Sequence, residues 1–465
     1  MDDSTSGLSD EHLSDNEPIV WETFESDMGS GSMHISVVGS GYVGTTLAAC
    51  LADLGHETVA IDIDETTVSR LNAGESTIHE PGLDELLTRH AGDRLRATVD
   101  HTAVVDTAMT FLAVGTPANP DGTIDERALV QAARDVGEAL RAKESYHLVV
   151  IKSTVPPDVI EEQVIPELTD AAGKSLGEHL GLAVNPEFLR EGSAVEDFLN
   201  PDKIVLGTTN DPQATRLLET LFRPIAERSG ATIVSTGRAE ACLIKYANNA
   251  FLAVKLSFIN DLGNVCKAFG VDTYEIAEAI GLDHRISPSY LRSGLGWGGS
   301  CLPKDTTALL QAARSHGYNP RLIEAAIEVN ELQPQRMLAL LERELSIPGK
   351  RIAVLGLAFK PGTDDIRETR AIPVIEGLLE RDAEVIAYDP NADAVDAMRS
   401  QFPEISYADS AEDALTGAQA ACIVTDWPEF AELDWAFAGM SRPLVIDGRR
   451  IIEPSDEIEY HGLTW

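Results

Sequence analysis

The sequence predicts an α/β protein with two doubly wound, mostly parallel sheets that a central helical segment joins. Short apolar runs alternate with helical patterns up to about residue 225, long helical patterns follow, and the alternation returns at Lys350. Strands that alternate with helices form βαβ units and parallel sheets. The expected parts are an extension at 1–32, a first α/β domain at 33–236, helices at 237–345 and a second α/β domain at 346–465.

Residues 1–32 carry nine acidic side chains and no Lys or Arg, and they are rich in Ser and Gly. This composition predicts a disordered extension. A strand pattern follows Met33 directly, so we expect a chain that starts at Met33 to keep its activity.

The first α/β domain is predicted from apolar runs at residues 34–38, 58–61, 109–113, 147–151 and 181–184. The first run leads into Gly39, Gly41 and Gly44 in the pattern G-x-G-x-x-G, and the second ends at Asp62, about 20 residues on. In a Rossmann-like NAD-binding domain these glycines serve a tight turn, the approach of a pyrophosphate and helix packing. An acidic residue at this position binds the ribose and repels a 2′-phosphate, which favours NAD over NADP. The alternative is a glycine-rich turn that binds nothing.

Polar residues follow three further strands at the edge where parallel sheets bind ligands. Thr116 follows the third run, Thr154 follows the fourth, and Glu187 follows the fifth. Taken singly, each is as typical of a turn as of a functional site.

Helical patterns over residues 239–268 and 321–344 predict the central segment. Lys245 and Asn249 are four residues apart and therefore lie on one helix face. A cation beside an amide can stabilise an oxyanion. The alternative is a solvated lysine beside an ordinary helical asparagine.

The strongest signal is a glycine-rich interruption with the sequence Gly298-Gly-Ser-Cys301-Leu-Pro-Lys304-Asp305. A cysteine at a helix start can have its thiolate stabilised by backbone N–H groups and the helix dipole. Asp305 lies one turn further, where it can position a water or a proton. The alternative is a small buried cysteine that caps the turn.

The second α/β domain is predicted from apolar runs at residues 351–355, 385–388, 420–425 and 444–446. The pattern is shorter than in the first domain but has the same alternation. No literal repeat relates the two domains.

The charge balance excludes two kinds of partner. The 465 residues include 36 Lys plus Arg against 76 Asp plus Glu, a net charge of -40. Binding to nucleic acid or to an anionic membrane needs a basic surface instead. No apolar run reaches the roughly 20 residues that cross a bilayer.

An acidic surface with only ten lysines is typical of a halophilic protein, because concentrated salt screens the self-repulsion. An acidic mesophilic protein is the alternative. If lysine has been lost wherever it is dispensable, the remaining lysines should be enriched at required sites.

The five cysteines are widely spaced and form no C-x-x-C pair. Neither a disulfide framework nor a thiolate metal site fits this pattern, and we expect no metal. The reducing cytoplasm is the compartment that such a chain suits.

Together these motifs resemble the nucleotide-sugar 6-dehydrogenase family. The similarity runs in order over residues 33–452 and includes the glycine pattern, Thr154 and residues 185–191, 245–252, 298–305, 359–361 and 447–449. The run that starts at Lys245 is more similar to the UDP-glucose branch than to the GDP-mannose branch. Trp297 departs from the Tyr or Phe that commonly precedes Gly-Gly-Ser-Cys.

The resemblance implies a four-electron oxidation of UDP-glucose to UDP-glucuronate by a homo-oligomer that uses two NAD. Cys301 would attack the aldehyde, Lys245 and Asn249 would stabilise the oxyanion, and Glu187 would activate water against the thioester. Lys245 and Asp305 would take the first hydroxyl proton, with Thr154 and Glu187 working through water.

The resemblance also implies binding residues. NAD is expected to contact Gly39, Gly41, Tyr42, Val43, Gly44, Asp62, Thr116, Thr154, Glu191, Lys304 and Arg367. The sugar nucleotide is expected to contact Glu187, Phe188, Leu189, Arg190, Glu191, Lys245, Asn249, Tyr290, Gly294, Gly298, Lys360 and Arg449. Arg285 would reach the substrate of a neighbouring subunit, which implies at least a dimer.

Three alternatives stay open. The same chemistry could act on GDP-mannose or a UDP-N-acetylhexosamine, which the sequence separates only through loop details. A two-electron β-hydroxyacid dehydrogenase would lack the Cys301 motif and the second α/β domain. A non-catalytic nucleotide-sugar sensor would be signalled by loss of Cys301, Lys245 or Asp305, and all three are present.

Overall fold

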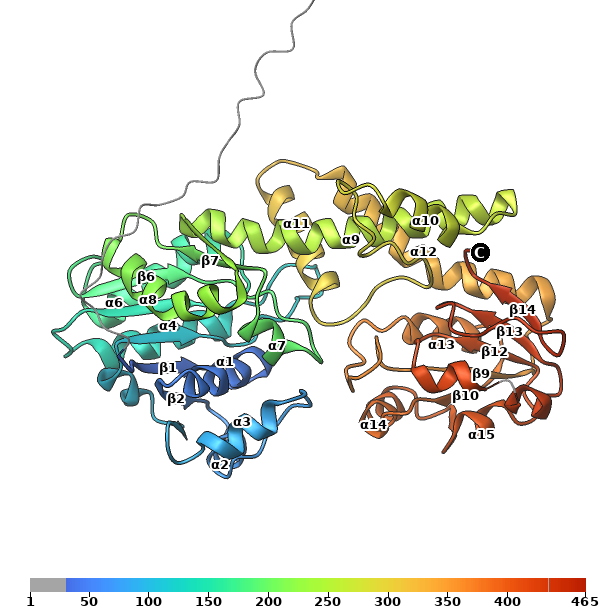
Figure 1. Cartoon of the computed structure of the whole chain (residues 1–465), viewed down its shortest axis with the longest axis horizontal. Coiled ribbons are helices and arrows are strands. Elements are labelled where there is room, and N and C mark those ends of the chain that lie inside the picture. Colours follow the sequence, from blue (N-terminus) through green and yellow to red (C-terminus); the bar gives the residue numbers. More distant parts are fainter. Residues whose placement is uncertain (1–30, 434) are drawn as a thin grey trace, which may run out of the picture.

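Two α/β lobes lie side by side, and a layer of helices joins them along one edge (Figure 1). The computed structural model describes residues 31–433 and 435–465. The extension expected at residues 1–32 therefore lies almost wholly outside the described residues.

The first lobe contains an eight-stranded sheet in the order β3-β2-β1-β4-β5-β6-β7-β8. Neighbouring strands pair in parallel except β6 with β7, which pair antiparallel. The strands are β1 (His34–Val38), β2 (Glu57–Ile61), β3 (Leu95–Thr98), β4 (Met109–Leu112), β5 (His147–Ile151), β6 (Leu180–Val184), β7 (Lys203–Gly207) and β8 (Thr232–Thr236).

Helices cover both faces of this sheet. They are α1 (Tyr42–Asp53), α2 (Glu65–Asn72), α3 (Leu83–His90), α4 (Arg127–Leu140), α5 (Pro157–Val159), α6 (Ile165–Ala172), α7 (Ala194–Leu199) and α8 (Pro212–Ser229), with short η1 (His101–Asp106) and η2 (Ile160–Val164). Leu148 and Val149 of β5 belong to different hydrophobic cores, because alternate strand residues point to opposite faces. All five residues of β5 are buried, as in a parallel sheet covered on both sides.

The central layer consists of α9 (Arg238–Phe269), α10 (Thr273–Gly281), α11 (Leu302–Ser315) and α12 (Arg321–Glu344). Helix α9 has 32 residues and runs from the first lobe toward the second (Figure 1). It packs against α10, α11 and α12. Gly270 ends it with φ of 69°, a left-handed conformation that favours glycine.

The second lobe is a six-stranded parallel sheet in the order β11-β10-β9-β12-β13-β14. Its strands are β9 (Arg351–Leu355), β10 (Glu384–Tyr388), β11 (Ser406–Tyr407), β12 (Ala420–Ile423), β13 (Leu444–Asp447) and β14 (Glu459–Gly462). Its helices are α13 (Ala371–Leu379), α14 (Ala392–Gln401) and α15 (Ala411–Leu415), with short η3 (Pro428–Glu432) and η4 (Ala436–Gly439).

The predicted fold class is confirmed, and each apolar run named from the sequence forms a strand within two residues of its expected ends. Strands β3, β7, β8, β11 and β14 were not predicted. Four of these strands have exposed or half-buried polar positions, and β7 has a short apolar run between Lys203 and Gly207. In the described ranges no helix is long and apolar enough to cross a membrane.

Candidate active site

A cavity of about 900 Å³ lies where the two lobes and the central helices meet. The first lobe contributes the loop after β6, the central segment contributes α9 and the turn before α11, and the second lobe contributes Phe359, Lys360 and Arg449. Residues from three distant parts of the sequence therefore line one space.

The buried centre of this cavity is an ion pair between Lys245 and Glu187. The Lys245 Nζ lies 2.7 Å from Glu187 Oε1, and the second carboxylate oxygen accepts a hydrogen bond from the backbone N–H of Leu189 at 2.6 Å. Burial opposes both charges, but the Lys245 ammonium keeps the pKa of Glu187 below its ordinary value. The carboxylates of Glu187 and Asp305 likewise outweigh burial and raise the pKa of Lys245. Lys245 is therefore held protonated.

A second carboxylate is bound one turn further along the same face of α9. The amide of Asn249 donates to Asp305 Oδ2 at 2.7 Å, and Lys304 Nζ donates to Asp305 Oδ1 at 2.7 Å. Asp305 is buried one turn into α11, and its backbone N–H donates to the carbonyl of Cys301. The predicted face of Lys245 and Asn249 therefore meets Glu187 and Asp305, one carboxylate each.

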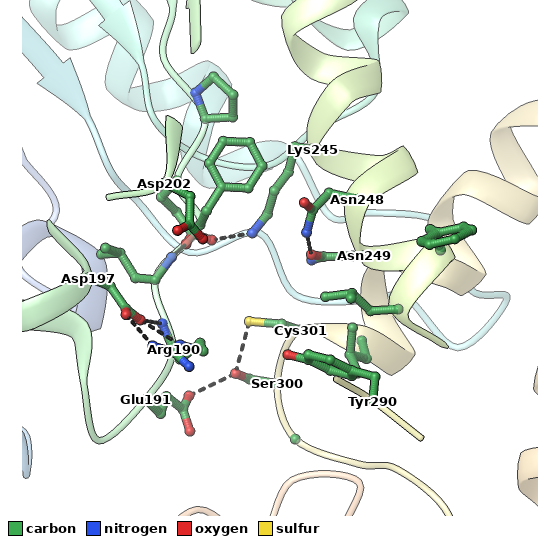
Figure 2. A pocket seen from close by; sticks show the side chains of 18 of the residues that line it. Arg190, Glu191, Asp197, Asp202, Lys245, Asn248, Asn249, Tyr290, Ser300 and Cys301 are labelled. Atoms are coloured by element: carbon green, nitrogen blue, oxygen red, sulfur yellow. Dashed lines mark hydrogen bonds and ion pairs between the residues drawn. The ribbon is translucent and has the colours of Figure 1, made fainter. Parts of the chain in front are cut away.

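Cys301 is the N-cap residue of α11 and turns its sulfur into the cavity (Figure 2). The other four cysteines are buried. Burial and the nearby Glu187 carboxylate raise the pKa of the Cys301 thiol, while Lys245 opposes them. The first two effects oppose the stabilisation of the thiolate that a helix start can provide.

Glu191 joins the three parts of the chain. Its Oε1 accepts from the hydroxyl of Ser300 at 2.8 Å and from the guanidinium of Arg367 at 3.3 Å. The ammonium of Lys360 donates to its backbone carbonyl. Arg367 also makes a two-point pair with Asp365.

Other residues predicted to bind the sugar nucleotide line the same cavity. Phe188 lies beneath the ammonium of Lys203, 4.1 Å from the ring centre. Arg190 is held by Asp197 (Figure 2). Leu189, Tyr290 and Gly298 also line this cavity. So does the half-buried Arg449, whose guanidinium donates to the carbonyls of Val424 and Gly296.

At two of the predicted substrate residues, Gly294 and Gly298, nearby backbone atoms leave no room for a side chain. A Cβ at Gly294 would lie 2.4 Å from the carbonyl oxygen of Gly448, and one at Gly298 would lie 2.1 Å from that of Glu368. The backbone on each side must therefore approach closely. Gly294 does not line the cavity.

The glycine loop between β1 and α1 fits a dinucleotide. A Cβ at Gly39 would meet the backbone of Ala113 and Val114 within 2.9 Å, and one at Gly44 would lie 1.8 Å from the Gly39 oxygen. A Cβ at Gly41 would meet nothing within 4 Å, so this side of the loop is open. No side chain caps the first turn of α1, which Tyr42 and Val43 begin. The N–H groups of this turn can therefore bind a phosphate.

Residues at neighbouring strand ends surround this loop. Asp62 accepts a hydrogen bond from the backbone N–H of Ser40 at 2.6 Å, and Thr116 donates to the carbonyl of Thr154 at 3.0 Å. None of these residues lines the cavity around Cys301. Glu80 links the two sites, because its carboxylate accepts from the Tyr42 hydroxyl and from the backbone of Gly192 and Ala194.

Arg285, like Gly294, is a predicted substrate residue that does not line the cavity. It lies exposed after α10 and pairs with Asp283, two residues away. Within residues 31–433 and 435–465 no group of three or more His, Cys, Asp or Glu side chains could hold a metal ion.

Three sequence profiles match the chain in order. The UDP-glucose/GDP-mannose dehydrogenase family's NAD binding domain matches residues 33–226, its central domain matches 239–332, and its UDP binding domain matches 353–454. The chain belongs to the UDP-glucose/GDP-mannose dehydrogenase family. It is an NAD-dependent oxidoreductase of this family, and the glycine loop lies in the part that matches the NAD binding domain.

Individual members of the family are similar over nearly the whole chain. The UDP-glucose 6-dehydrogenase AglM of Haloferax volcanii is 56% identical over 433 residues, which are 93% of this chain and 100% of that protein. A UDP-glucose 6-dehydrogenase of Rhizobium meliloti is 39% identical over 93% of this chain and 98% of its own. The solved UDP-glucose dehydrogenase of Pyrobaculum islandicum superposes with a TM-score of 0.88 and 42% identity, covering 95% of this chain and 100% of its own.

Sequence reasoning assigned no role to several cavity residues. Lys152 is buried and donates to Asn185 at 2.8 Å, and burial lowers its pKa to about 8. Lys203 donates to Asn248 at 3.0 Å. The scarcity of lysine was the signal that could have found them, since five of the ten lysines line this cavity. Ser300 and Asp365 carried no such signal, because their role depends on contacts with Glu191 and Arg367.

Proposed function

We propose that the chain oxidises UDP-glucose to UDP-glucuronate at the cavity around Cys301. The observation that carries the proposal is the meeting of the Cys301 thiol, the Lys245–Glu187 pair and Asn249 in one cavity, with Asp305 behind Asn249. The name of the Haloferax volcanii relative supports UDP-glucose as the substrate. The UDP-binding profile over residues 353–454 supports a UDP sugar.

NAD, when bound, accepts the hydride in each of two oxidations. The N–H groups at the start of α1 are suited to its pyrophosphate, and Asp62 is suited to its ribose. Thr116 and Thr154 lie at the same sheet edge, and Glu191, Lys304 and Arg367 lie beside Cys301, where they would hold the reactive end.

In the first oxidation the sugar C6 hydroxyl loses its proton and the carbon loses a hydride, which leaves an aldehyde. A carboxylate is the better proton acceptor, because Lys245 is held protonated while Glu187 stays ionised. We assign the proton to Glu187 through water. Lys245 then acts as a cation that stabilises the developing alkoxide.

Cys301 then captures the aldehyde. Its thiol proton passes to Glu187 or water, the sulfur forms a bond to the aldehyde carbon, and Lys245 with Asn249 stabilises the resulting oxyanion. Loss of a second hydride from this carbon leaves a thioester.

Water closes the cycle. Glu187, having passed its earlier protons to solvent, takes a proton from water, and the oxygen attacks the thioester carbon. The carbon–sulfur bond then breaks, and the released Cys301 thiolate regains its proton. One sugar and one water have then yielded a carboxylate, two hydrides and three protons.

The cations of the second lobe suit the diphosphate. Lys360 and Arg449 line the cavity from this lobe, and Lys203 lies across from them in the first lobe. An anionic substrate needs such a local positive site on a chain with a net charge of -40.

The assembly that we propose is a dimer built on α9. Phe251, Phe258 and Val265 recur at intervals of seven on this helix and are 65%, 55% and 47% exposed. An apolar stripe of this kind suits burial by a second copy, and Arg285 is then free to reach the partner's cavity. A Phe258→Glu variant that sediments with the mass of the unmodified protein would overturn this assembly.

The free cysteines suit a cytoplasmic location.

The function is tested with a panel of nucleotide sugars and NAD or NADP in concentrated KCl, with NADH absorbance as the readout. We expect turnover with UDP-glucose and NAD. Faster turnover with GDP-mannose or a UDP-N-acetylhexosamine would move the substrate assignment within the family. Absence of turnover with every sugar, in folded protein, would favour a sensor and overturn the proposal.

A further inference from the structure

Ser300 lies between Glu191 and Cys301, and its hydroxyl contacts both side chains (Figure 2). Its Oγ donates to Glu191 Oε1 at 2.8 Å and lies 3.5 Å from the sulfur of Cys301. No role was assigned to Ser300 above, although it is the residue directly before the nucleophile.

A serine hydroxyl has one proton and two lone pairs. Because that proton is donated to Glu191, the Ser300 oxygen can only accept a hydrogen bond from the Cys301 thiol. A thiolate would have no donor from Ser300 in this arrangement. If the proton turned toward the sulfur, the hydroxyl would stabilise the thiolate through a charge-assisted hydrogen bond.

The carboxylate of Glu191 can accept further hydrogen bonds. Its Oε1 accepts from Ser300 and Arg367, whereas its buried Oε2 has no hydrogen-bond partner in the described part of the chain. Burial and the carboxylate of Asp365 raise the pKa of Glu191. A new donor at Oε2 would supply the partner that this oxygen lacks, and a new donor at Oε1 would compete with Ser300.

We propose that Ser300 is a positioning residue that couples the hydrogen bonding of Glu191 to the reactivity of Cys301. When Glu191 no longer takes the hydroxyl proton, the hydroxyl turns to the sulfur and favours the thiolate. The inference rests on the proposed function, in which Cys301 attacks the aldehyde and Glu191 contacts NAD. The nucleophile would then be activated in a site that holds the cofactor.

Other charged groups lie near Cys301 and near Glu191, the two side chains that Ser300 contacts. Glu187 from the loop after β6, Lys245 from α9 and Asp305 from α11 act on Cys301. Arg367 and Asp365 from the second lobe act on Glu191, and Lys360 binds its backbone. None of these groups is changed in the variants below, so their effects cancel between the compared proteins.

The test measures the rate at which iodoacetamide alkylates Cys301 as a function of pH, in the full chain without NAD. Mass spectrometry of the Cys301 peptide isolates this residue from the four buried cysteines. Glu191→Ala removes the competing acceptor. We expect it to lower the alkylation pKa of Cys301 by about one unit, a tenfold change in the thiolate-to-thiol ratio.

Glu191→Ala also removes a negative charge near Cys301. Making it in proteins with and without the Ser300 hydroxyl separates the effect of that hydroxyl from the effect of the lost charge. In Ser300→Ala protein, Glu191→Ala should move the alkylation pKa by much less, whereas in Ser300→Thr protein, which keeps a hydroxyl, it should move it fully. Equal shifts in the Ala and unmodified backgrounds, or no shift in either, would overturn the proposal. Glu191→Met, which keeps side-chain volume but accepts no strong hydrogen bond, serves if Glu191→Ala does not fold.

Alkylation needs no turnover. The alkylation pKa of Cys301 can therefore be independent of Ser300 while the unmodified enzyme still oxidises UDP-glucose. Equally, it can depend on Ser300 while the NADH assay finds no turnover. The two results separate this inference from the proposed function.

Discussion

Lys245 and Glu187, 58 residues apart in the sequence, form an ion pair of 2.7 Å with side-chain exposures of only 4% and 9%. Removing both charges from water is costly, and the pair repays this only while both members are present. Because the pair lies beside Cys301, a cation and a carboxylate are both available there in a buried site. Changes to one partner should therefore affect stability as well as catalysis.

The Lys245→Met variant should be less stable by about 3 kcal/mol, since it leaves the Glu187 carboxylate buried without its partner. It should also lose most turnover, because no cation would stabilise the oxyanion. Urea unfolding and the NADH assay measure the two effects. Lys255→Met is the stability control on the same helix, because the half-buried Lys255 donates to the carbonyl of Ile286 and pairs with no carboxylate of the described residues. Equal losses of stability in the two variants would contradict this account.

Acid should weaken the unmodified protein through Glu187. The folded pKa of this carboxyl lies below its ordinary value of 4.5. The stabilisation is thus present above that value and is lost as the pH falls through the lower folded pKa. The Glu187→Gln variant cannot lose it, so its thermal midpoint should fall less between about pH 5 and about pH 3. Parallel pH profiles for the two proteins would show that the pair does not contribute.

Cys301 should determine the stoichiometry of the reaction. Because the sulfur holds the aldehyde for a second oxidation, we expect two NADH for each sugar consumed. Cys301→Ala should form no acid and at most release aldehyde slowly, which product analysis by mass spectrometry would detect. Full four-electron turnover by this variant would refute the covalent mechanism.

Two glycines of the NAD loop should respond differently to alanine. A Cβ at Gly44 would lie 1.8 Å from the Gly39 oxygen, so Gly44→Ala should destabilise the first lobe by at least about 1–3 kcal/mol. A Cβ at Gly41 would meet nothing within 4 Å, so Gly41→Ala should fold normally but bind NAD more weakly. Thermal melts and NAD titration by calorimetry compare them. Normal NAD binding by Gly41→Ala would place the pyrophosphate elsewhere.

Salt should stabilise the protein. The net charge of -40 repels itself at low ionic strength, and the Debye length falls from about 10 Å at 0.1 M to about 3 Å at 1 M salt. Activity and thermal midpoint should rise together as KCl approaches molar concentration, because screening also helps the anionic substrates approach. Full activity in dilute buffer with inhibition by KCl would refute the halophilic interpretation while leaving the enzymatic one intact.

Local patterns were enough to predict much of this fold and site. The run at residues 34–38, the three glycines and Asp62 predicted β1, its loop and the ribose carboxylate, because strand periodicity and turn chemistry involve neighbours in sequence. The spacing of Lys245 and Asn249 predicted one helix face for the same reason. Edge strands such as β11 escaped prediction because a two-residue strand has no period of its own.

The sequence by itself determined the order of the α/β and helical parts, the glycine loop and the choice of Cys301 as the candidate nucleophile. Only the tertiary structure decided that Lys245 pairs with Glu187, that burial and Glu187 raise the pKa of the Cys301 thiol, and that the Ser300 hydroxyl donates a hydrogen bond to Glu191. These facts depend on desolvation and on contacts between distant segments. Glu191 and Arg367, for example, are 176 residues apart, and no local pattern encodes their meeting.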